Sequence, residues 1–445
     1  MTPDLEAKIE RLKMKNAAKT LNVLGRLLVD GREMTVWERD TNTLPRGERK
    51  WRYRARAFAR EHIRPLAAEA DLHPHDFDPK PLLRAAVKAG FQTLLVVPPI
   101  GRASTISYLM RPTFQLVLAA EEFTTEDGGL GLLLLAHNLG IGPVFLCGHL
   151  PTYIRHFLPF YIKARWFGDI SCMAFAITEP SAGSDVEDTE GAAQARLITT
   201  ARPVNGGYVL NGRKCFISDG AIADKVTVYA KLEGEDIESW TCFLVDKSME
   251  GFSVGRRENK MGQRASDASE LILEDVFVPT RNIVGKLRSG WANNKNVLNY
   301  SRPAVGAMAL GQARGAFERA LEFCRTTYLG PKRLIEYQDV QIELADMMLS
   351  IWTARAMVWH SCKAFRSCQS LASATKVSVS DTAFRVCNQA MELMGDNGYL
   401  HKYGVEKAMR DARLTQIYEG TNQMNRLSII ERQWDAEINK PTLGY

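Results

Sequence analysis

The chain has 445 residues, of which 45% are hydrophobic and 24% are charged, and its formal net charge is +6. This length accommodates two or three packed domains, the composition is that of a soluble globular protein, and the charge is too small for a nucleic-acid binder. No continuous apolar run reaches the length of a membrane span, and no secretory signal opens the chain. The eight cysteines form no CxxC pair or zinc-ligand spacing, so we expect reduced thiols, a cytoplasmic protein and no metal site.

Two basic segments open the chain. Residues 4–29 have helical apolar spacing with more basic than acidic residues, and residues 46–60 interleave basic side chains with Trp51, Tyr53 and Phe58. One interpretation is an electrostatic patch for anionic lipid, nucleic acid or a substrate phosphate. The other, which we favour for 46–60, is a solvated helix face whose aromatic side chains pack inward.

Helical spacing continues to about residue 166. Residues 81–91 and 111–123 predict amphipathic helices, and residues 129–148 are apolar nearly all round, which predicts a helix buried between neighbours.

The pattern changes to short β-prone runs at about residue 171. The Asn205-Gly206-Gly207 and Asn211-Gly212 sequences are both turn signals between such runs. Further strands are expected until Pro279, so this part predicts a compact β domain.

Helical spacing returns after Gly290. Residues 301–327 are rich in small residues that permit close helix contact, and further helices are expected over 338–365 and 380–396. We expect a long loop over 396–419, of the kind that often carries function, and a last helix over 423–438.

Three polar stretches are candidates for a site, and each also has a purely structural interpretation. The hydroxyl and glycine residues of 174–185 could bind a ligand or simply form a turn, and residues 215–220 could be a strand end. Residues 392–400 could bind a phosphate through backbone N–H groups or form a helix C-cap. The chain has no GxGxxG, P-loop or GxSxG motif, which argues against a Rossmann site or an α/β-hydrolase.

The carboxylate of Glu419 lies between Tyr418 and Gly420 in the sequence. From these residues alone it is either an ordinary solvated loop acid or a base placed over a reactive group.

Three segments, in this order and spacing, resemble the acyl-CoA dehydrogenase family over roughly residues 50–435. They are ITEPSAGSD at 177–185, MGQRASD at 261–267 and GVEKAMRDARLTQIYEGTNQMNRLSI at 404–429. The resemblance implies an α+β fold that contains bound FAD and forms a homotetramer, or at least a dimer that shares FAD sites. Its parts would be an N-terminal extension (1–50), an N-terminal helical domain (51–170), a middle β-sandwich or barrel domain (171–283) and a C-terminal four-helix bundle (284–445).

The resemblance also implies roles for individual residues. Glu419 falls on the family's catalytic base. Implied FAD contacts in the same subunit are Phe175, Ala176, Ile177, Thr178, Ser184, Phe216, Ile217, Ser218, Thr421 and Gln423. Implied contacts with the FAD of a neighbouring subunit are Gln338, Glu392, Gly395 and Asp396. Implied acyl-CoA contacts are Ser184, Asn299, Arg302, Tyr418 and Gly420.

The implied reaction is the oxidation of an acyl-CoA to a trans-2-enoyl-CoA. Glu419 would remove the α-proton, the β-hydride would pass to the flavin, and an electron-transfer flavoprotein would accept the electrons. Some family members carry the base on the helix near Arg302, but the matching residue here is Ser301, which cannot act as that base. This leaves Glu419 as the candidate.

Other functions stay open on the same fold. They are an enoyl-CoA reductase, an acyl-CoA oxidase, a flavin monooxygenase and a scaffold or assembly factor without catalysis. Retention of Glu419 argues against a monooxygenase.

The chain departs from the family at two FAD-contacting stretches. Thr326 to Leu329 replace an Arg-x-Thr-Phe run, with one inserted residue before Gln338, so that Arg325 or Lys332 would have to supply the charge. Glu392 replaces a common glutamine. Residues 1–50 have no counterpart in the family and could contact a neighbouring subunit, a membrane or a partner protein.

Residues 126–138 indicate which acyl groups the protein would accept. This stretch offers no cation, which disfavours a dicarboxylyl-CoA, and Gly128, Gly129 and Gly131 are expected to leave room for a branched, cyclic or medium-length acyl group.

Overall fold

The computed structural model describes residues 7–8, 11–12, 34–92, 94, 113–187, 189–363 and 368–438. The chain divides into two compact units, residues 1–49 and 50–445. The first contains α3 (Val36–Asn42), which begins with a capping box: Glu38 N–H donates to Thr35 Oγ1 (3.2 Å), and Thr35 N–H donates to Glu38 Oε2 (2.9 Å). Most of the helix expected over 4–29 lies outside the described residues.

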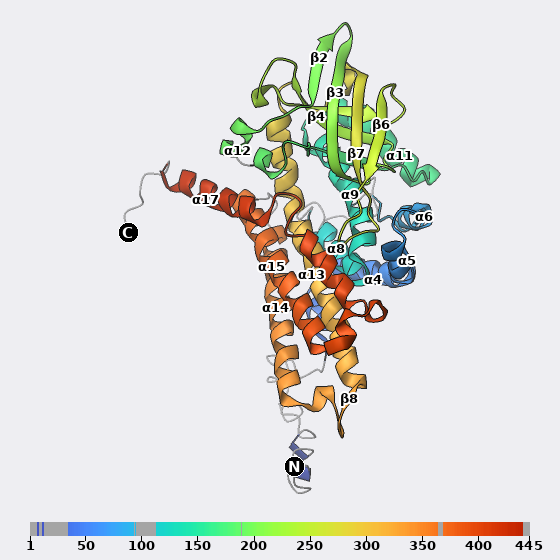
Figure 1. The fold of residues 1–445 in the computed structure, drawn as a ribbon, viewed down its shortest axis with the longest axis vertical. Helices are drawn as coiled ribbons and strands as arrows, with labels where there is room; N and C mark the ends of the chain where they lie inside the picture. The colour runs from blue at the N-terminus through green and yellow to red at the C-terminus, as the bar shows by residue number, and fades with distance from the viewer. Residues whose placement is uncertain are drawn as a thin grey trace. The chain divides into compact units, whose positions relative to one another are not determined.

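The N-terminal part of the second unit is helical (Figure 1). Its elements are most of α4 (Arg46–Phe58), then η2 (Ala59–Ile63), η3 (Arg64–Leu66), α5 (Ala67–Leu72), α6 (Lys80–Ala89), α8 (Phe114–Glu126), α9 (Gly128–Leu146), α10 (Leu150–Thr152), η4 (Tyr153–Phe157) and α11 (Leu158–Phe167).

Helix α9 is the buried helix expected over residues 129–148, although by length and composition it could also span a membrane. Its length and its mean hydropathy of 1.7 would suffice, but 78% of that window is buried inside the protein, as in a core helix. The neutral His137 ring joins α9 to the sheet by accepting the Met173 N–H at 2.9 Å; burial lowers the pKa of His137 to about 3.

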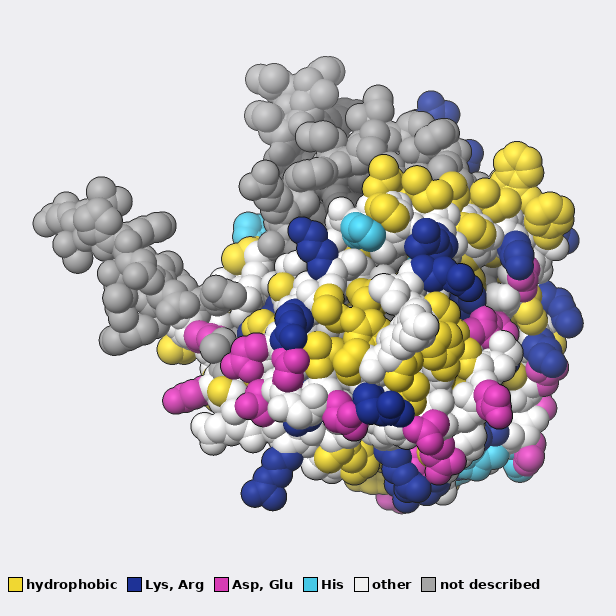
Figure 2. Space-filling view, turned by 90° about the horizontal axis from the view of Figure 1, so that it is seen from above, with side chains coloured by type: hydrophobic (Ala, Val, Ile, Leu, Met, Phe, Trp, Pro, Cys, Tyr) yellow, Lys and Arg dark blue, Asp and Glu magenta, His cyan; other side chains and the backbone are white. Residues whose placement is uncertain are grey.

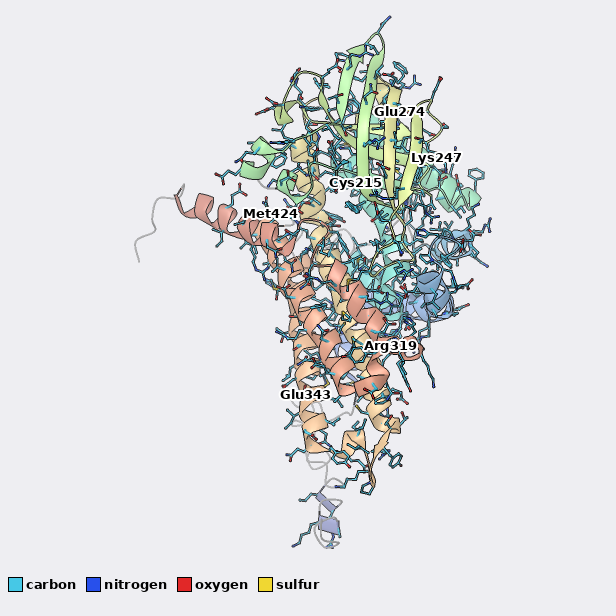
Figure 3. All side chains as sticks on the ribbon, viewed as in Figure 1. Cys215, Lys247, Glu274, Arg319, Glu343 and Met424 are labelled. Atoms are coloured by element: carbon cyan, nitrogen blue, oxygen red, sulfur yellow. The ribbon has the colours of Figure 1, made fainter. Side chains whose placement is uncertain are left out.

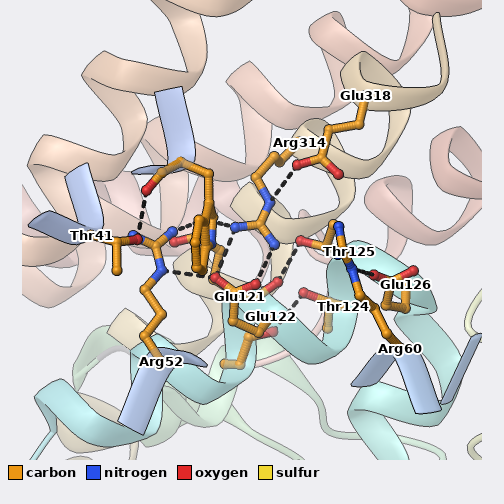
Figure 4. A network of polar contacts seen from close by, with 12 residues as sticks. Thr41, Arg52, Arg60, Glu121, Glu122, Thr124, Thr125, Glu126, Arg314 and Glu318 are labelled. Carbon is orange, nitrogen blue, oxygen red and sulfur yellow. Dashed lines mark hydrogen bonds and ion pairs between the residues drawn. The ribbon is translucent and has the colours of Figure 1, made fainter. Parts of the chain in front are cut away.

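The basic run at 46–60 forms a helix with a solvated face, but it also contributes Arg52 to a buried group of ion pairs. Trp51 and Phe58 are buried as expected, whereas Tyr53 is exposed. Arg52 is fully buried, and its guanidinium contacts Glu121 and Glu122 of α8, each at 2.8 Å. Arg314, from a later helix, shares these carboxylates (Figure 4). Arg355, from another later helix, also pairs with Glu121 at 2.8 Å. The cluster therefore fixes four helices to one another.

The middle part is a seven-stranded sheet. Its strands are β1 (Met173–Ala176), β2 (Thr200–Val204), β3 (Gly207–Ser218), β4 (Lys225–Leu232), β5 (Thr241–Asp246), β6 (Phe252–Arg257) and β7 (Ala268–Pro279). The order is β1-β4-β2-β3-β7-β6, with β5 paired to β4; β4 runs parallel to β1 and β2, and the other pairs are antiparallel. The short elements η5 (Ser184–Glu187) and α12 (Thr189–Gln194) follow β1, while η6 (Ile237–Ser239) and η7 (Thr280–Asn282) lie in later connections.

Only the first of the two Asn-Gly signals is a turn. Asn205 and Gly206 join β2 to β3, whereas Asn211 and Gly212 lie inside β3, at an irregularity in its pairing with β7. There the Asn211 side chain bonds to Asp275 on the neighbouring strand, so the sequence forms a bulge instead of a reversal.

The C-terminal part is a helical bundle (Figure 1). It comprises α13 (Gly290–Thr326), the exposed hairpin β8 (Tyr328–Leu329) and β9 (Lys332–Arg333), η8 (Leu334–Glu336), α14 (Gln338–Lys363), α15 (Gln369–Leu393), η9 (Gly395–Tyr399), η10 (His401–Tyr403), α16 (Val405–Leu414) and α17 (Asn422–Ile438). The expected close helix contact is present: a Cβ at Gly311 of α13 would overlap Thr124 Oγ1 of α8.

The expected long loop over 396–419 is wrong, because α16 occupies residues 405–414. Gly404 adopts a left-handed conformation at its start, and Val405, Ala408 and Ala412 form a buried stripe at helical spacing. The irregular segment before Glu419 is therefore only a few residues long, which limits the motion of the carboxylate.

One face of the molecule mixes both signs of charge (Figure 2). On the face in Figure 2, Lys and Arg side chains are interspersed with Asp and Glu across the described residues.

The sheet contains a buried ion pair that offers a test of the fold. Lys214 Nζ lies 2.7 Å from Glu179 Oε1 with both side chains fully buried, and it also donates to Ile177 O at 3.0 Å. We expect Lys214→Met to lower the free energy of unfolding by about 3–5 kcal/mol, because it leaves the buried Glu179 carboxylate without its cation. Arg202→Met, which removes an exposed pair with Glu233 in the same sheet, should cost at most about 1 kcal/mol in urea unfolding. Equal losses in the two variants would contradict this assignment.

Candidate functional site

A cavity of about 280 Å³ lies where the sheet, α9 and the bundle meet. Most of its lining side chains are apolar. The lining residues come from α8 and α9 (Leu116, Leu132, Leu135, Ala136, Asn138, Leu139, Gly142, Leu146), from β1, η5 and the segment between them (Phe175, Ile177, Thr178, Gly183, Ser184, Glu187), from β3 (Phe216, Ile217, Ser218), from α13 (Val297, Leu298, Tyr300, Ser301, Ala304, Val305, Met308), and from residues 417–420.

Glu419 places its carboxylate in this cavity. The residue has φ 52°, a left-handed conformation that is uncommon outside glycine, and its Oε2 accepts a 2.6 Å hydrogen bond from Ser301 Oγ. Burial raises the pKa of Glu419 to about 7; Glu187 adds to the rise, while the Ser301 hydroxyl, Arg302 and Lys376 oppose it. Near neutral pH this carboxyl can therefore both accept and return a proton.

The backbone around Glu419 is held from behind by buried donors. Arg302 Nε donates to Glu419 O (3.4 Å), Lys376 Nζ to Gly420 O (2.7 Å), and Asn425 Nδ2 to Gly420 O (2.8 Å). Among the described residues, the Glu419 backbone N–H forms no backbone hydrogen bond. This N–H can therefore bind an oxygen of a substrate.

Gly420 is required by its surroundings. Its φ is 81°, and a Cβ there would overlap Glu187 Oε2 and approach Asn425 Nδ2. Glu187 in turn accepts from Arg302 Nη2 at 2.8 Å. Arg302, expected to touch substrate, is thus buried beside the loop and absent from the cavity lining.

The other residues expected to form the site fall into two groups. Phe175, Ile177, Thr178, Ser184, Phe216, Ile217, Ser218, Tyr418 and Gly420 line the cavity. Ala176 alternates away from Phe175 on β1 and packs in the core of the sheet. Asn299 lies on α13 outside the cavity lining.

At the start of α17, some of the groups expected to contact FAD form hydrogen bonds within the protein. Thr421 N–H donates to Ser184 Oγ (3.1 Å), and Thr421 Oγ1 accepts from Met424 N–H (3.3 Å), while Gln423 is exposed. Figure 3 labels Met424 on this helix.

Four residues expected to reach a neighbouring subunit are outside the cavity. Gln338 begins α14, Glu392 is near the end of α15, and Gly395 and Asp396 are in η9; all four are exposed. At the altered stretch, Arg325 pairs with Glu322 (3.8 Å) and Lys332 lies in the β8–β9 hairpin.

The expectation that three glycines make room for the acyl group is wrong. A Cβ at Gly128 would lie 2.7 Å from Asp411 Oδ2, at Gly129 2.9 Å from Ala265 N, and at Gly131 2.6 Å from Thr124 Cγ2. These glycines let neighbouring segments approach α9, and none of them lines the cavity.

Family models match most of the chain in three consecutive parts. They are the acyl-CoA dehydrogenase N-terminal domain (residues 46–159), middle domain (174–276) and C-terminal domain (288–433). The chain belongs to the acyl-CoA dehydrogenase family.

Individual acyl-CoA dehydrogenase relatives match along most of their length. Cyclohexane-1-carbonyl-CoA dehydrogenase of Geobacter metallireducens is 33% identical over 377 residues, which are 84% of this chain and 94% of that protein. The caffeyl-CoA reductase-Etf complex subunit CarC of Acetobacterium woodii is 31% identical over 318 residues, 70% of this chain and 80% of that one. The structure of butyryl-CoA dehydrogenase from Megasphaera elsdenii has a TM-score of 0.79 at 28% identity, covering 88% of this chain and 99% of that one.

Members of the acyl-CoA dehydrogenase family are oxidoreductases that bind FAD and act on the CH–CH group of an acyl-CoA. The residues present fit a flavin ring. Phe216 has φ 56°, rare for a bulky side chain, and 60% of it is exposed at the cavity. It lies with the aromatic Phe175 and the hydroxyls of Thr178 and Ser218 in the lining, which together suit a flat, polar-edged ring.

Sequence reasoning missed two charged residues of this site, Glu187 and Lys376. Lys376 gave a signal that could have found it: it falls among Ala372, Val379 and Ala383 on the buried stripe of α15. A lysine is rarely buried without a partner. Glu187 gave no such signal, because it ends the four-residue element η5, which is too short to show a buried stripe.

The raised pKa of Glu419 predicts a pH-dependent stability. The folded protein holds this proton up to about pH 7 instead of the ordinary 4.5, so stability is fully present below 4.5 and is lost as pH rises through 7. Glu419→Gln cannot ionise, and we expect it to be more stable than wild type by on the order of 2 kcal/mol at about pH 8, with little difference at about pH 4.5.

Urea unfolding at both pH values measures this difference. Glu343→Gln is the control, since Glu343 is exposed on α14 away from the sheet (Figure 3). An equal gap at both pH values, or a gap of opposite sign, would be inconsistent with the raised pKa.

Proposed function

We propose that this protein catalyses α,β-dehydrogenation of an acyl-CoA to a trans-2-enoyl-CoA, with Glu419 as the base. The observation that carries the proposal is the Glu419 carboxylate in an apolar cavity, bonded to Ser301 at 2.6 Å, with its pKa raised to about 7. A carboxylate made more basic by burial is better matched to a weakly acidic α-proton than one in water.

The chain's own residues support each part of this role. The Glu419 N–H can donate to the thioester oxygen, which would stabilise the negative charge that develops as the α-proton leaves. The side chains from α9 and α13 would exclude water from the acyl group and align its Cα with Glu419. When bound, FAD supplies a two-electron acceptor for the β-hydride. Arg302 and Asn425 would keep the Glu419 backbone still during the transfer.

The proposed acyl group is uncharged and largely apolar. The cavity is lined by aliphatic and aromatic side chains, and the described lining includes no Lys or Arg. A carboxylate at the end of the acyl chain would therefore be buried without a cation at considerable cost.

The proposed electron acceptor is an electron-transfer flavoprotein, and the proposed assembly is a homo-oligomer. The first is supported by the Etf complex named for the Acetobacterium woodii relative. The second is supported by the exposed position of Gln338, Glu392, Gly395 and Asp396, where a neighbouring subunit could use them.

A second candidate is enoyl-CoA reduction at the same site. It is supported by the reductase relative and by the pKa of Glu419 near 7, at which the protonated carboxyl can return a proton to Cα. Both directions need the same residues, so the reduction potentials of substrate and partner would decide between them.

The test of the proposed function is anaerobic reduction of the FAD-loaded protein by a panel of saturated acyl-CoAs, followed as loss of flavin absorbance. Wild type should be bleached by at least one monocarboxylic acyl-CoA. Glu419→Gln should keep FAD and bind the same acyl-CoA, but reduce about 10²–10⁴-fold more slowly, because it lacks the base.

Glu343→Gln is again the control and should match wild type. No bleaching of FAD-loaded wild type by any acyl-CoA would exclude the dehydrogenase, and rapid reoxidation of dithionite-reduced protein by enoyl-CoAs alone would favour the reductase. Rapid reoxidation by air would indicate an oxidase, and a protein that takes up no FAD would indicate the scaffold.

A further inference from the structure

A lysine on the buried stripe of α15 contacts the Glu419 loop from outside the cavity. The Lys376 side chain is fully buried. Its Nζ donates to Gly420 O at 2.7 Å and to Asn422 Oδ1 at 2.8 Å, and Asn422 Nδ2 is itself bound to Asp381 Oδ1 at 2.7 Å. Neutral donors such as Asn425 already bind the same carbonyl, so hydrogen bonding alone does not explain a buried cation here.

A second carboxylate contacts the same loop from the cavity side. Glu187, at the end of η5, lines the cavity and accepts from Arg302 Nη2 at 2.8 Å. Its Oε2 lies so close to Gly420 that no Cβ fits between them. The loop that carries Glu419 is thus contacted at Gly420 by both Lys376 and Glu187.

The charges that face Glu419 are balanced. Glu187 comes from η5, Arg302 from α13 beside the Ser301 hydroxyl, and Lys376 from α15. Together with Glu419, the charged groups are two acids (Glu187 and Glu419) and two bases (Arg302 and Lys376). One step further out, Lys295 Nζ donates to Glu187 O at 2.8 Å, and Asp381 acts on Lys376.

We propose that Lys376 and Glu187 are positioning residues that set, with opposite signs, how readily Glu419 gives up its proton. Lys376 favours the ionised base and Glu187 opposes it, both through a short stretch of low-dielectric protein where charges act strongly. This inference rests on the proposed role of Glu419 as the base.

The pKa shifts of Lys376 and Glu187 support an electrostatic interaction with Glu419. Burial lowers the pKa of Lys376 to about 7, while Glu187 and Glu419 oppose that fall. Burial also raises the pKa of Glu187, against the effects of Arg302 and Lys376. Lys376 and Glu419 therefore each affect the ionisation of the other.

The test measures kcat/KM as a function of pH. On the acidic side of this profile, called the acidic limb, the rate should rise as Glu419 ionises. With FAD-loaded protein and the acyl-CoA that reduces it best, Lys376→Met should move this limb to higher pH by about one unit, because a cation near the carboxylate is lost. Glu187→Gln should move it to lower pH by a similar amount, because an anion is lost and Arg302 is released. Lys376→Arg keeps the cation and should restore the limb to within a few tenths of wild type.

A matched control separates charge from packing. Val379→Ala removes a fully buried side chain from the same helix without changing charge; it should lower the melting temperature but leave the limb in place. The inference is overturned if Val379→Ala moves the limb as far as Lys376→Met, if Lys376→Met and Glu187→Gln move it in the same direction, or if neither moves it. If Lys376→Met does not fold, the sign of the Glu187→Gln shift decides.

A readout without turnover makes failure of the inference distinguishable from failure of the proposed function. The infrared absorbance of the protonated Glu419 carboxyl, assigned by its loss in Glu419→Gln, can be titrated in each variant. The same opposite shifts are expected there even if no acyl-CoA in the panel reduces the wild-type protein, and their absence would overturn the inference by itself.

Discussion

The site depends on holding one carboxylate in an apolar cavity. Burial of a charge is costly unless other charges or hydrogen bonds compensate it, yet full compensation would leave Glu419 as weak a base as it is in water. The structure meets both demands by keeping one direct bond, from Ser301 Oγ at 2.6 Å, on the carboxylate itself. The cations Arg302 and Lys376 instead bind backbone carbonyls of the loop. The carboxylate is thus fixed in position but only partly stabilised, which fits a pKa near 7.

That arrangement requires the supporting helices to keep their places. Ser301 and Arg302 lie on α13, Lys376 on α15 and the acyl-facing leucines on α9, so relative motion of these helices would move the groups apart. The buried cluster of Arg52, Arg314 and Arg355 around Glu121 and Glu122 holds α13 against α4, α8 and α14, because sliding one of these helices would leave a buried charge unpaired. Close contacts such as that between Gly311 and Thr124 add a steric limit.

Much of the fold could be predicted from the sequence, since apolar periodicity gave α6, α8, α9 and α14 and the β-prone runs gave the sheet. Errors arose where a local signal has two physical uses. An Asn-Gly pair serves a turn at 205–206 and a bulge at 211–212, and which one forms depends on Asp275, a residue distant in the sequence. Gly128, Gly129 and Gly131 could equally admit a substrate or a neighbouring segment, and only the tertiary contacts with Asp411, Ala265 and Thr124 decide.

In the candidate site, too, local sequence signals indicated some residues, whereas tertiary contacts could not be predicted. Resemblance to a family indicated Glu419 and the residues of β1 and β3 as site residues. It could not predict the contacts of Arg302 with Glu187 and Ser373, which are distant from it in the sequence in opposite directions. It also missed Lys376, although a cation on the apolar stripe of a helix is a physical contradiction that only a buried partner can resolve. Charged residues on the apolar stripe of a helix therefore call for buried partners, which either stabilise the fold, as for Arg314, or lie beside the site, as for Lys376. In this chain, following one of them leads to the loop that carries the proposed base.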